Sequence, residues 1–320
     1  MTITRPPTHD PAHSSRRLRR ILIVGLAAAS IAVPGLWAIR AAHGTGSTAR
    51  AASTPAPATA VRPAARRRLS RATRLKRADR RAHRALAAAL SPILAASGGT
   101  LAVGVVDLTT GVTVTHDGGR RFHTASIVKA DILAALLLRH QATGTPLSED
   151  ERELAVAMIE HSDNDAASAL WYDIGEGSGL AAANVRLGLR HTTPGSGGYW
   201  GLTSTTVADQ LRLLTDLTSR RSPLNRSSRA CELALMRAVE RDQAWGVSAA
   251  ATSRASVAVK NGWLPDPDLW VINSIGLVPH DGHRLLIAVL SDGHDSEAAG
   301  VSACEQAAVA AASAALEAWR

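Results

Sequence analysis

Apolar positions along the chain change period twice, and this pattern predicts an α+β fold. Alternation in TLAVGVVDLTTG (100–111) and VTVTHDGG (112–119) predicts an early hairpin with a glycine in its turn. Alternation returns late and predicts three more strands, in SVAVKNGW (256–263), DLWVINSIGLV (268–278) and HRLLIAVLSD (283–292).

Helical spacing of apolar residues fills the interval between these strands. The predicted helices cover residues 85–97, 127–140, 148–161, 165–172, 205–218, 229–240 and 302–319. We therefore expect one antiparallel sheet, made of the early hairpin and the three late strands and flanked by helices. The first and last strands must share that sheet, so the all-helical block is an insertion on one side.

The N-terminal residues differ from the rest and predict export. SSRRLRR precedes ILIVGLAAASIAVPGLWAI, an uncharged run at 21–39 that is close to the shortest length for a bilayer span. A basic end (1–20) followed by such a run indicates a signal peptide or a membrane anchor, with the basic end in the cytoplasm. We expect the folded part to be extracytoplasmic, either secreted or anchored to the cytoplasmic membrane by residues 21–39.

Charge is divided unevenly, so the pI near 10.8 describes only part of the chain. Residues 1–84 carry 18 basic and 2 acidic side chains, whereas residues 85–320 carry 18 basic and 25 acidic ones. This division argues against a nucleic-acid-binding protein. Composition predicts a disordered basic tether at 40–80 and a folded domain at 81–320. The basic stretch 66–84 either attracts anionic lipid or wall polymer, or is a solvated linker that becomes the first helix of the domain.

Cys231 and Cys304 are the two cysteines. Outside the cytoplasm they either pair or remain as separate buried thiols. Neither has His or Cys at ligand spacing, so we expect no metal and no cofactor.

Ser126-Ile-Val-Lys129 begins an apolar helix and is the first candidate for chemistry. Serine and lysine at i and i+3 lie on one helix face. A serine hydroxyl needs a base, which neutral lysine can be and arginine cannot. The chain has only three lysines among 36 basic residues, so retention of lysine here favours proton transfer. The alternative is an N-cap serine beside an exposed lysine.

Ser162-Asp163-Asn164 and Lys260-Asn261-Gly262 are the other two candidates. Ser162-Asp163-Asn164 is either a helix break with an N-cap or a hydroxyl and amide beside Lys129. Asn-Gly is a strong hairpin turn signal, but two prolines follow in WLPDPD and disfavour a return strand there. If the strand continues, Lys260 presents a cation at the sheet edge and Gly262 lets a substrate approach the backbone.

In this order, SIVK, SDN and KNG resemble the penicillin-recognising serine hydrolases, and the chain is most similar to the class A β-lactamase family. The resemblance covers roughly residues 85–318 and implies a β-lactamase/transpeptidase-like fold. It implies that Ser126 is acylated, that Lys129 acts as base or relay, and that Ser162 passes a proton to the leaving nitrogen.

The same resemblance supplies the binding roles. Asn164 would orient Lys129 and the substrate amide, and Lys260, Asn261, Gly262 and Trp263 would bind the substrate. The N–H groups of Ser126 and Trp263 would form the oxyanion hole, commonly worth ~3–4 kcal/mol per donor.

Three features depart from the family pattern, and the last of them bears on deacylation. Asn261 stands where the family has Thr or Ser, and the short spacing between Ser126 and Ser162 implies that a hairpin over the site is missing. Residues 177–208 contain no Asp or Glu, so the omega-loop glutamate has no counterpart. His191 is the only obvious substitute base there.

We therefore expect a monomeric serine hydrolase that forms an acyl-enzyme with a β-lactam or a D-alanyl peptide from peptidoglycan and deacylates slowly. The alternatives are a cell-wall D-Ala peptidase or penicillin-binding protein, and a non-catalytic wall-binding or sensing module.

Overall fold

The computed structural model describes residues 63–266 and 268–318. The predictions for the basic end (1–20), for the signal or anchor segment (21–39) and for most of the tether (40–62) lie outside these residues.

One antiparallel sheet organises the fold, in the strand order β2-β1-β7-β6-β5. The strands are β1 (Thr100–Asp107), β2 (Thr113–His116), β5 (Ala258–Asp266), β6 (Leu269–His280) and β7 (His283–His294). β1 pairs with β7 along its whole length, from Thr100 opposite Asp292 to Asp107 opposite Leu285. The prediction that the first and last strands share one sheet is confirmed.

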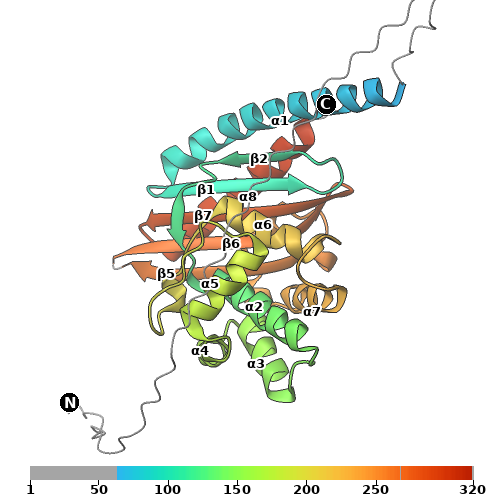
Figure 1. Ribbon diagram of the computed structural model, residues 1–320. Helices are drawn as coiled ribbons and strands as arrows, with labels where there is room; N and C mark the ends of the chain where they lie inside the picture. Colours follow the sequence, from blue (N-terminus) through green and yellow to red (C-terminus); the bar gives the residue numbers. More distant parts are fainter. Residues whose placement is uncertain (1–62, 267, 319–320) are drawn as a thin grey trace, which may run out of the picture. The chain divides into compact units, whose positions relative to one another are not determined.

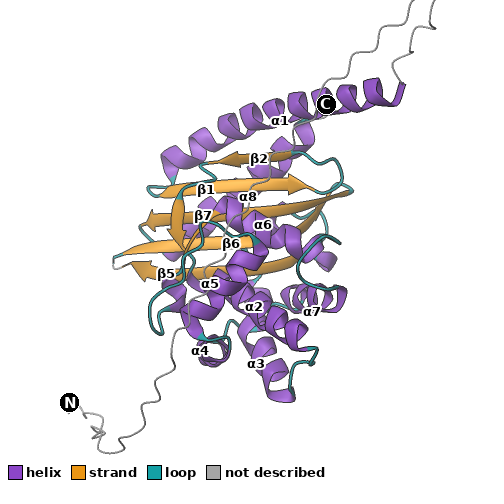
Figure 2. Ribbon diagram, in the orientation of Figure 1, coloured by secondary structure: helices purple, strands orange, loops and turns teal. Residues whose placement is uncertain are grey.

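Helices cover both faces of this sheet (Figures 1 and 2). α1 (Pro63–Ala96) and α8 (Glu297–Glu317) lie on one face, and α6 (Val207–Thr218) lies on the other with the helical block. That block also contains α2 (Val128–Thr143), α3 (Glu149–Glu160), α4 (Asn164–Asp173), α5 (Glu176–Leu187) and α7 (Arg226–Arg237). The predicted inserted helical subdomain is therefore present, with α5 as a helix that the apolar pattern did not reveal.

A small second sheet joins β3 (Arg121–His123) to β4 (Ser204–Thr206). Neither strand was predicted, since each has three residues and no usable alternation. Phe122 opposite Thr205 brings the segment before Ser126 beside the loop that follows α5.

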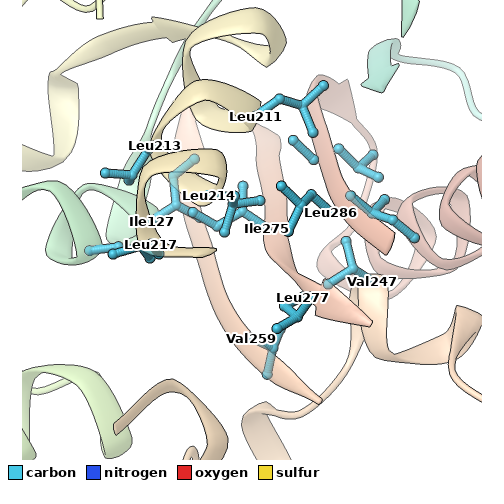
Figure 3. Packing of buried hydrophobic residues seen from close by; sticks show 14 of the residues in the cluster. Ile127, Leu211, Leu213, Leu214, Leu217, Val247, Val259, Ile275, Leu277 and Leu286 are labelled. Atoms are coloured by element: carbon cyan, nitrogen blue, oxygen red, sulfur yellow. The ribbon is translucent and has the colours of Figure 1, made fainter. Parts of the chain in front are cut away.

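Close packing of α6 on the sheet depends on a strand residue without a side chain. A Cβ at Gly104 of β1 would lie 2.7 Å from both Val207 and Leu211. Leu211 and Leu214 of α6 face Ile275 and Leu286 of the sheet (Figure 3). This layer holds α6 and the neighbouring start of α2 against β6.

The predicted domain start at residue 81 is wrong, because α1 begins at Pro63 and replaces the last part of the expected tether. Ala78, Ala82 and Leu86 are buried at a spacing of four, which gives this arginine-rich segment a core-facing stripe. The stretch 66–84 is therefore part of the first helix of the domain, and its predicted attraction to an anionic lipid or polymer stays a prediction.

Cys231 of α7 and Cys304 of α8 are both free thiols in the structure. Among the described helices, α8 is long and apolar enough to cross a membrane. However, 56% of its most apolar stretch is buried inside the protein. It is a core helix lying on the sheet.

Two carboxyl groups are buried between α2 and α7 without partners. The side-chain oxygens of Asp131 and Glu232 have no hydrogen-bond partner within the described residues. Burial, and then repulsion from Asp209, raises the pKa of Asp131 to about 7, and burial followed by repulsion from Asp131 raises the pKa of Glu232. Both groups are therefore protonated in the folded protein under mildly acidic conditions.

This pair predicts a stability that falls as pH rises. In the unfolded chain Asp131 ionises near its ordinary pKa of 3.8, whereas the folded protein retains the proton to about pH 7. The tighter proton binding of folded Asp131 adds to the unfolding free energy. This contribution is complete below pH 3.8 and is lost as the pH rises to about 7; its upper size is about 4 kcal/mol. We expect Asp131→Asn to flatten the unfolding free energy between pH 4.5 and pH 7, as measured by urea denaturation. Exposed Glu153→Gln is the control, and equal pH slopes in the two variants would contradict this interpretation.

Candidate active site

Ser126 lies on a short 3-10 turn, η1 (Ala125–Ile127), that leads directly into α2. The Thr124 N–H donates to the Thr203 carbonyl (2.8 Å), and Ala125 has a left-handed φ of 46°. The buried Asn273 amide of β6 donates to the carbonyls of His123 (2.8 Å) and Thr124 (3.0 Å). The turn is therefore held from two sides, and Ser126 remains half-buried at its tip.

Lys129 is fully buried one helical turn after Ser126. Its Nζ lies 2.6 Å from the Ser162 carbonyl oxygen, 2.8 Å from Asn164 Oδ1 and 3.1 Å from Ser162 Oγ. The exposed-lysine alternative is therefore excluded. Three short contacts hold the amine at one point, which is what a positioned base requires.

Ser162 and Asn164 reach this amine because the chain turns sharply between α3 and α4. Ser162 has a left-handed φ of 54°, and the Asp163 side chain accepts a hydrogen bond from the Ala166 N–H as the N-cap of α4. Both interpretations of this tripeptide are therefore correct. Asp163 caps the start of α4 after the helix break, while Ser162 and Asn164 face Lys129.

Lys260 approaches the same hydroxyl from the edge strand β5. Its Nζ lies 3.0 Å from Ser162 Oγ and 3.0 Å from the Asn261 carbonyl oxygen, and the side chain is fully buried. Ser162 Oγ is therefore shared by two amines, one from α2 and one from β5.

Two buried amines on one hydroxyl cannot both hold a proton at low cost. Burial lowers the pKa of Lys129 to about 7, opposed by the Asp163 carboxylate. Burial, and then repulsion from Lys129, lowers the pKa of Lys260 to about 7. Near neutral pH, therefore, one of the two can be an uncharged amine.

Gly262 is where β5 meets the Ser126 turn. A Cβ at this position would lie 2.6 Å from the Ser126 nitrogen, 2.7 Å from the Ile127 nitrogen and 2.8 Å from the Thr124 carbonyl oxygen. β5 continues past it to Asp266, so the Asn-Gly pair is not a turn, and Pro265 is accommodated because the strand is at the sheet edge.

Asn261 is a predicted site residue whose side chain the structure does not bring to the cluster. Successive strand residues face opposite sides, so Asn261 points away from Lys260. Its Nδ2 donates to the carbonyls of Gln243 (2.6 Å) and Trp245 (3.1 Å). The expectation that its amide meets the substrate is wrong, and the residue instead ties β5 to the loop behind it.

Trp263 follows Gly262 on β5 and is half-buried. Its ring meets Trp245 edge to face, with centroids 5.8 Å apart. The structure brings the backbones of residues 262 and 126 together, and the oxyanion role of the Ser126 and Trp263 N–H groups stays a prediction.

Trp200 is a neighbour of Lys129 that the sequence analysis missed. It lies in η2 (Trp200–Leu202), and the centre of its ring is 4.9 Å from Lys129 Nζ. Its Nε1 donates to Ser168 Oγ (3.2 Å). An aromatic residue in a glycine-rich loop of a chain with 3% aromatics was the available signal.

His191 belongs to the same loop, and hydrogen bonds to its backbone hold it in place. Its N–H donates to Asp209 Oδ2 (2.7 Å), and its carbonyl accepts from Arg121 (2.7 Å). The side chain is exposed. In the part of the chain that the structure describes, no group of three or more His, Cys, Asp or Glu side chains is placed to hold a metal ion.

Comparisons with known proteins agree with this geometry. A sequence profile of the beta-lactamase enzyme family matches residues 147–316, a range that includes Ser162, Asn164 and Lys260 and begins after Ser126 and Lys129. Proteins named as lipoprotein LppW in Mycobacterium bovis and Mycobacterium tuberculosis are 30% identical over 212 residues, which is 64% of this chain and 67% of theirs.

Solved structures share the fold. A beta-lactamase from Xanthomonas campestris is 23% identical, with a TM-score of 0.60 over 70% of this chain and 95% of its own. A beta-lactamase from Sphaerobacter thermophilus is 20% identical, with a TM-score of 0.62 over 72% and 97%. A PBP-A mutant in an acyl-enzyme complex with penicillin G is 19% identical, with a TM-score of 0.63 over 72% and 96%. These similarities confirm the predicted β-lactamase/transpeptidase-like fold.

Proposed function

The chain belongs to the beta-lactamase enzyme family, and from that premise we propose that it is an exported serine hydrolase that is acylated on Ser126 by a β-lactam or a D-alanyl peptide. The observation that carries the proposal is the position of Ser162 Oγ, 3.1 Å from Lys129 Nζ and 3.0 Å from Lys260 Nζ. Burying two lysines with lowered pKa values around one hydroxyl is costly, and a pair of neutral side chains would serve a purely structural role better.

The acylation step assigns a task to each of these groups. Neutral Lys129 takes the proton of the Ser126 hydroxyl while Ser126 Oγ forms a bond to the substrate carbonyl carbon. When the carbon–nitrogen bond breaks, the leaving nitrogen takes the proton of the Ser162 hydroxyl, which Lys129 then restores. Asn164 Oδ1 keeps the Lys129 amine oriented throughout (2.8 Å).

Lys260 attracts the substrate carboxylate that β-lactams and D-alanyl peptides share. Binding of that anion favours the protonated form of Lys260 and, by repulsion, the neutral form of Lys129. Substrate binding thus places the proton on the amine that does not act as base.

The loop 188–203 supplies no carboxylate for deacylation. The loop 188–203 contributes the Trp200 ring at 4.9 Å from Lys129 Nζ, and it contains neither Asp nor Glu. An indole cannot remove a proton from water, and its ring occupies space beside the amine. We therefore expect a long-lived acyl-enzyme.

Replacement of this ring by a carboxylate tests the explanation. Trp200→Glu should speed deacylation by about tenfold or more, because a general base contributes up to 10²–10⁴-fold when well placed. Decay of the penicilloyl adduct after removal of free penicillin, followed by intact-protein mass spectrometry, measures this step apart from acylation. Trp200→Gln is the matched control, since it opens the same space without a base; equal acceleration in both variants would show that the ring acts only by excluding water.

A cell-wall D-Ala peptidase or penicillin-binding protein is the second candidate, favoured by the absent carboxylate. Nitrocefin turnover separates the two. Repeated turnover after an initial burst supports a β-lactamase, whereas a single stoichiometric burst supports a penicillin-binding protein. No burst at all, with Ser126→Ala indistinguishable from the wild type, would contradict both and leave a binding or sensing module.

A further inference from the structure

The outer face of α1 carries a row of arginines that the proposed chemistry does not use. Arg74, Arg77, Arg80, Arg81 and Arg84, which we call the arginine face, are exposed and line a hollow of about 370 Å³ with Ala78 and Ala318. Positions 74, 77, 81 and 84 recur at helical spacing, so they project from one side of the helix.

Within residues 63–266 and 268–318, the arginine face has no anionic partner. Among the described residues, none of its five guanidinium groups forms an ion pair with a carboxylate. Elsewhere arginines are used differently: Arg152 pairs with Glu149, and Arg212 pairs with Asp216. The whole helix has nine arginines and one lysine against one aspartate.

Burial in the core explains the residues on the opposite side of α1, but it does not explain the arginines on this side. Ala78, Ala82 and Leu86 are buried against the rest of the domain, and α1 lies along the β2 edge of the sheet (Figure 1). Five like charges on the solvent side repel one another, and mixed charges would solvate a helix equally well. The selection of one sign points to an external anion.

We propose that the arginine face docks on an anionic lipid bilayer and holds the domain against the membrane. Guanidinium groups bind phosphate in a bidentate manner, and a row of them matches a surface of repeated phosphates. The sequence places the start of α1, Pro63, after a segment of 23 residues (40–62) that follows the uncharged run 21–39, and such a segment spans at most about 80 Å. If that run is retained in the membrane, the helix cannot leave the neighbourhood of the headgroups.

The test uses the full chain in lipid nanodiscs and measures arginine reactivity directly. Phenylglyoxal modifies accessible arginines, and peptide mass spectrometry gives the rate at each one. Discs of phosphatidylcholine are compared with discs that contain phosphatidylglycerol as well. Exposed Arg220 and Arg221, before α7, are internal controls in the same molecule.

We expect modification of Arg77, Arg81 and Arg84 to slow about fivefold or more in anionic discs, with Arg220 and Arg221 unchanged. Salt at ~0.5 M should restore the rate, because screening at that concentration acts over a few ångströms. In the R77E/R81E variant, Arg74 and Arg84 should lose their protection, whereas the matched R220E/R221E variant should keep it.

Two results would overturn the proposal. Equal rates at the arginine face in neutral and anionic discs would show that no bilayer contact forms. Protection in neutral discs by added soluble polyphosphate, without protection by anionic discs, would assign the face to an anionic polymer instead of a membrane.

Discussion

Lys129→Ala should reduce the rate of acylation by benzylpenicillin about 10²–10⁴-fold, the range typical for loss of a general base. The variant keeps Ser126, Ser162 and Lys260, so the loss reports proton transfer and not substrate charge recognition. Quenched-flow mass spectrometry measures the rate of adduct formation. Exposed Lys76→Ala is the control and should acylate at the wild-type rate.

The same position distinguishes a base from a fixed cation. Lys129→Arg keeps the charge but cannot deprotonate, so it should be as slow as Lys129→Ala. In the wild type the acylation rate should fall about tenfold for each pH unit well below 7, since the pKa of Lys129 is lowered to about 7 and only the neutral amine is active. A Lys129→Arg enzyme with normal acylation, or a rate independent of pH between 5 and 7, would eliminate the lysine as base.

Gly262→Ala should slow acylation about a hundredfold or more, because a displacement of about 1 Å at a reacting centre has effects of that size. The new methyl would lie within 2.8 Å of backbone atoms of Thr124, Ser126 and Ile127, none of which can swing away as a side-chain tip would. β5 or the Ser126 turn must move, and the distance between Lys260 and the nucleophile changes with it.

Gly119→Ala provides the control for this substitution. Gly119 is exposed, has open space at its Cβ position and needs no left-handed φ. Thermal unfolding of both variants separates a displaced site from an unfolded protein, since overpacking commonly costs 1–3 kcal/mol. Normal acylation in a folded Gly262→Ala protein would show that the close approach of β5 and the Ser126 turn is not required.

Much of the layout followed from local pattern. Alternation located the five strands of the main sheet, and helical spacing of the apolar residues between them located the inserted helical block. The rarity of lysine directed attention to Lys129, because proton transfer explains why arginine was avoided there, and the Lys-Asn-Gly motif identified Lys260. The two prolines after Trp263 correctly argued against a hairpin turn at Asn261-Gly262.

What the pattern missed depends on long-range packing. The orientation of Asn261 is set by the carbonyls of Gln243 and Trp245, which lie 18 and 16 residues earlier. Trp200 lies just before β4, and the pairing of β4 with β3 brings it near Lys129, far from it in the sequence. The start of α1 was placed too late because its arginines resemble a solvated linker until α8 and β2 supply a surface for its alanines and leucines to cover.

Peptide mass spectrometry of the penicillin-treated protein tests the central claim most directly. The two-amine site predicts one stoichiometric penicilloyl group, attached to Ser126 and still present long after free penicillin is removed. Ser126→Ala should carry none. Absence of any adduct on the wild type, or an adduct on a residue other than Ser126, would contradict the assignment of residues 126, 129, 162 and 260 to one acylating centre.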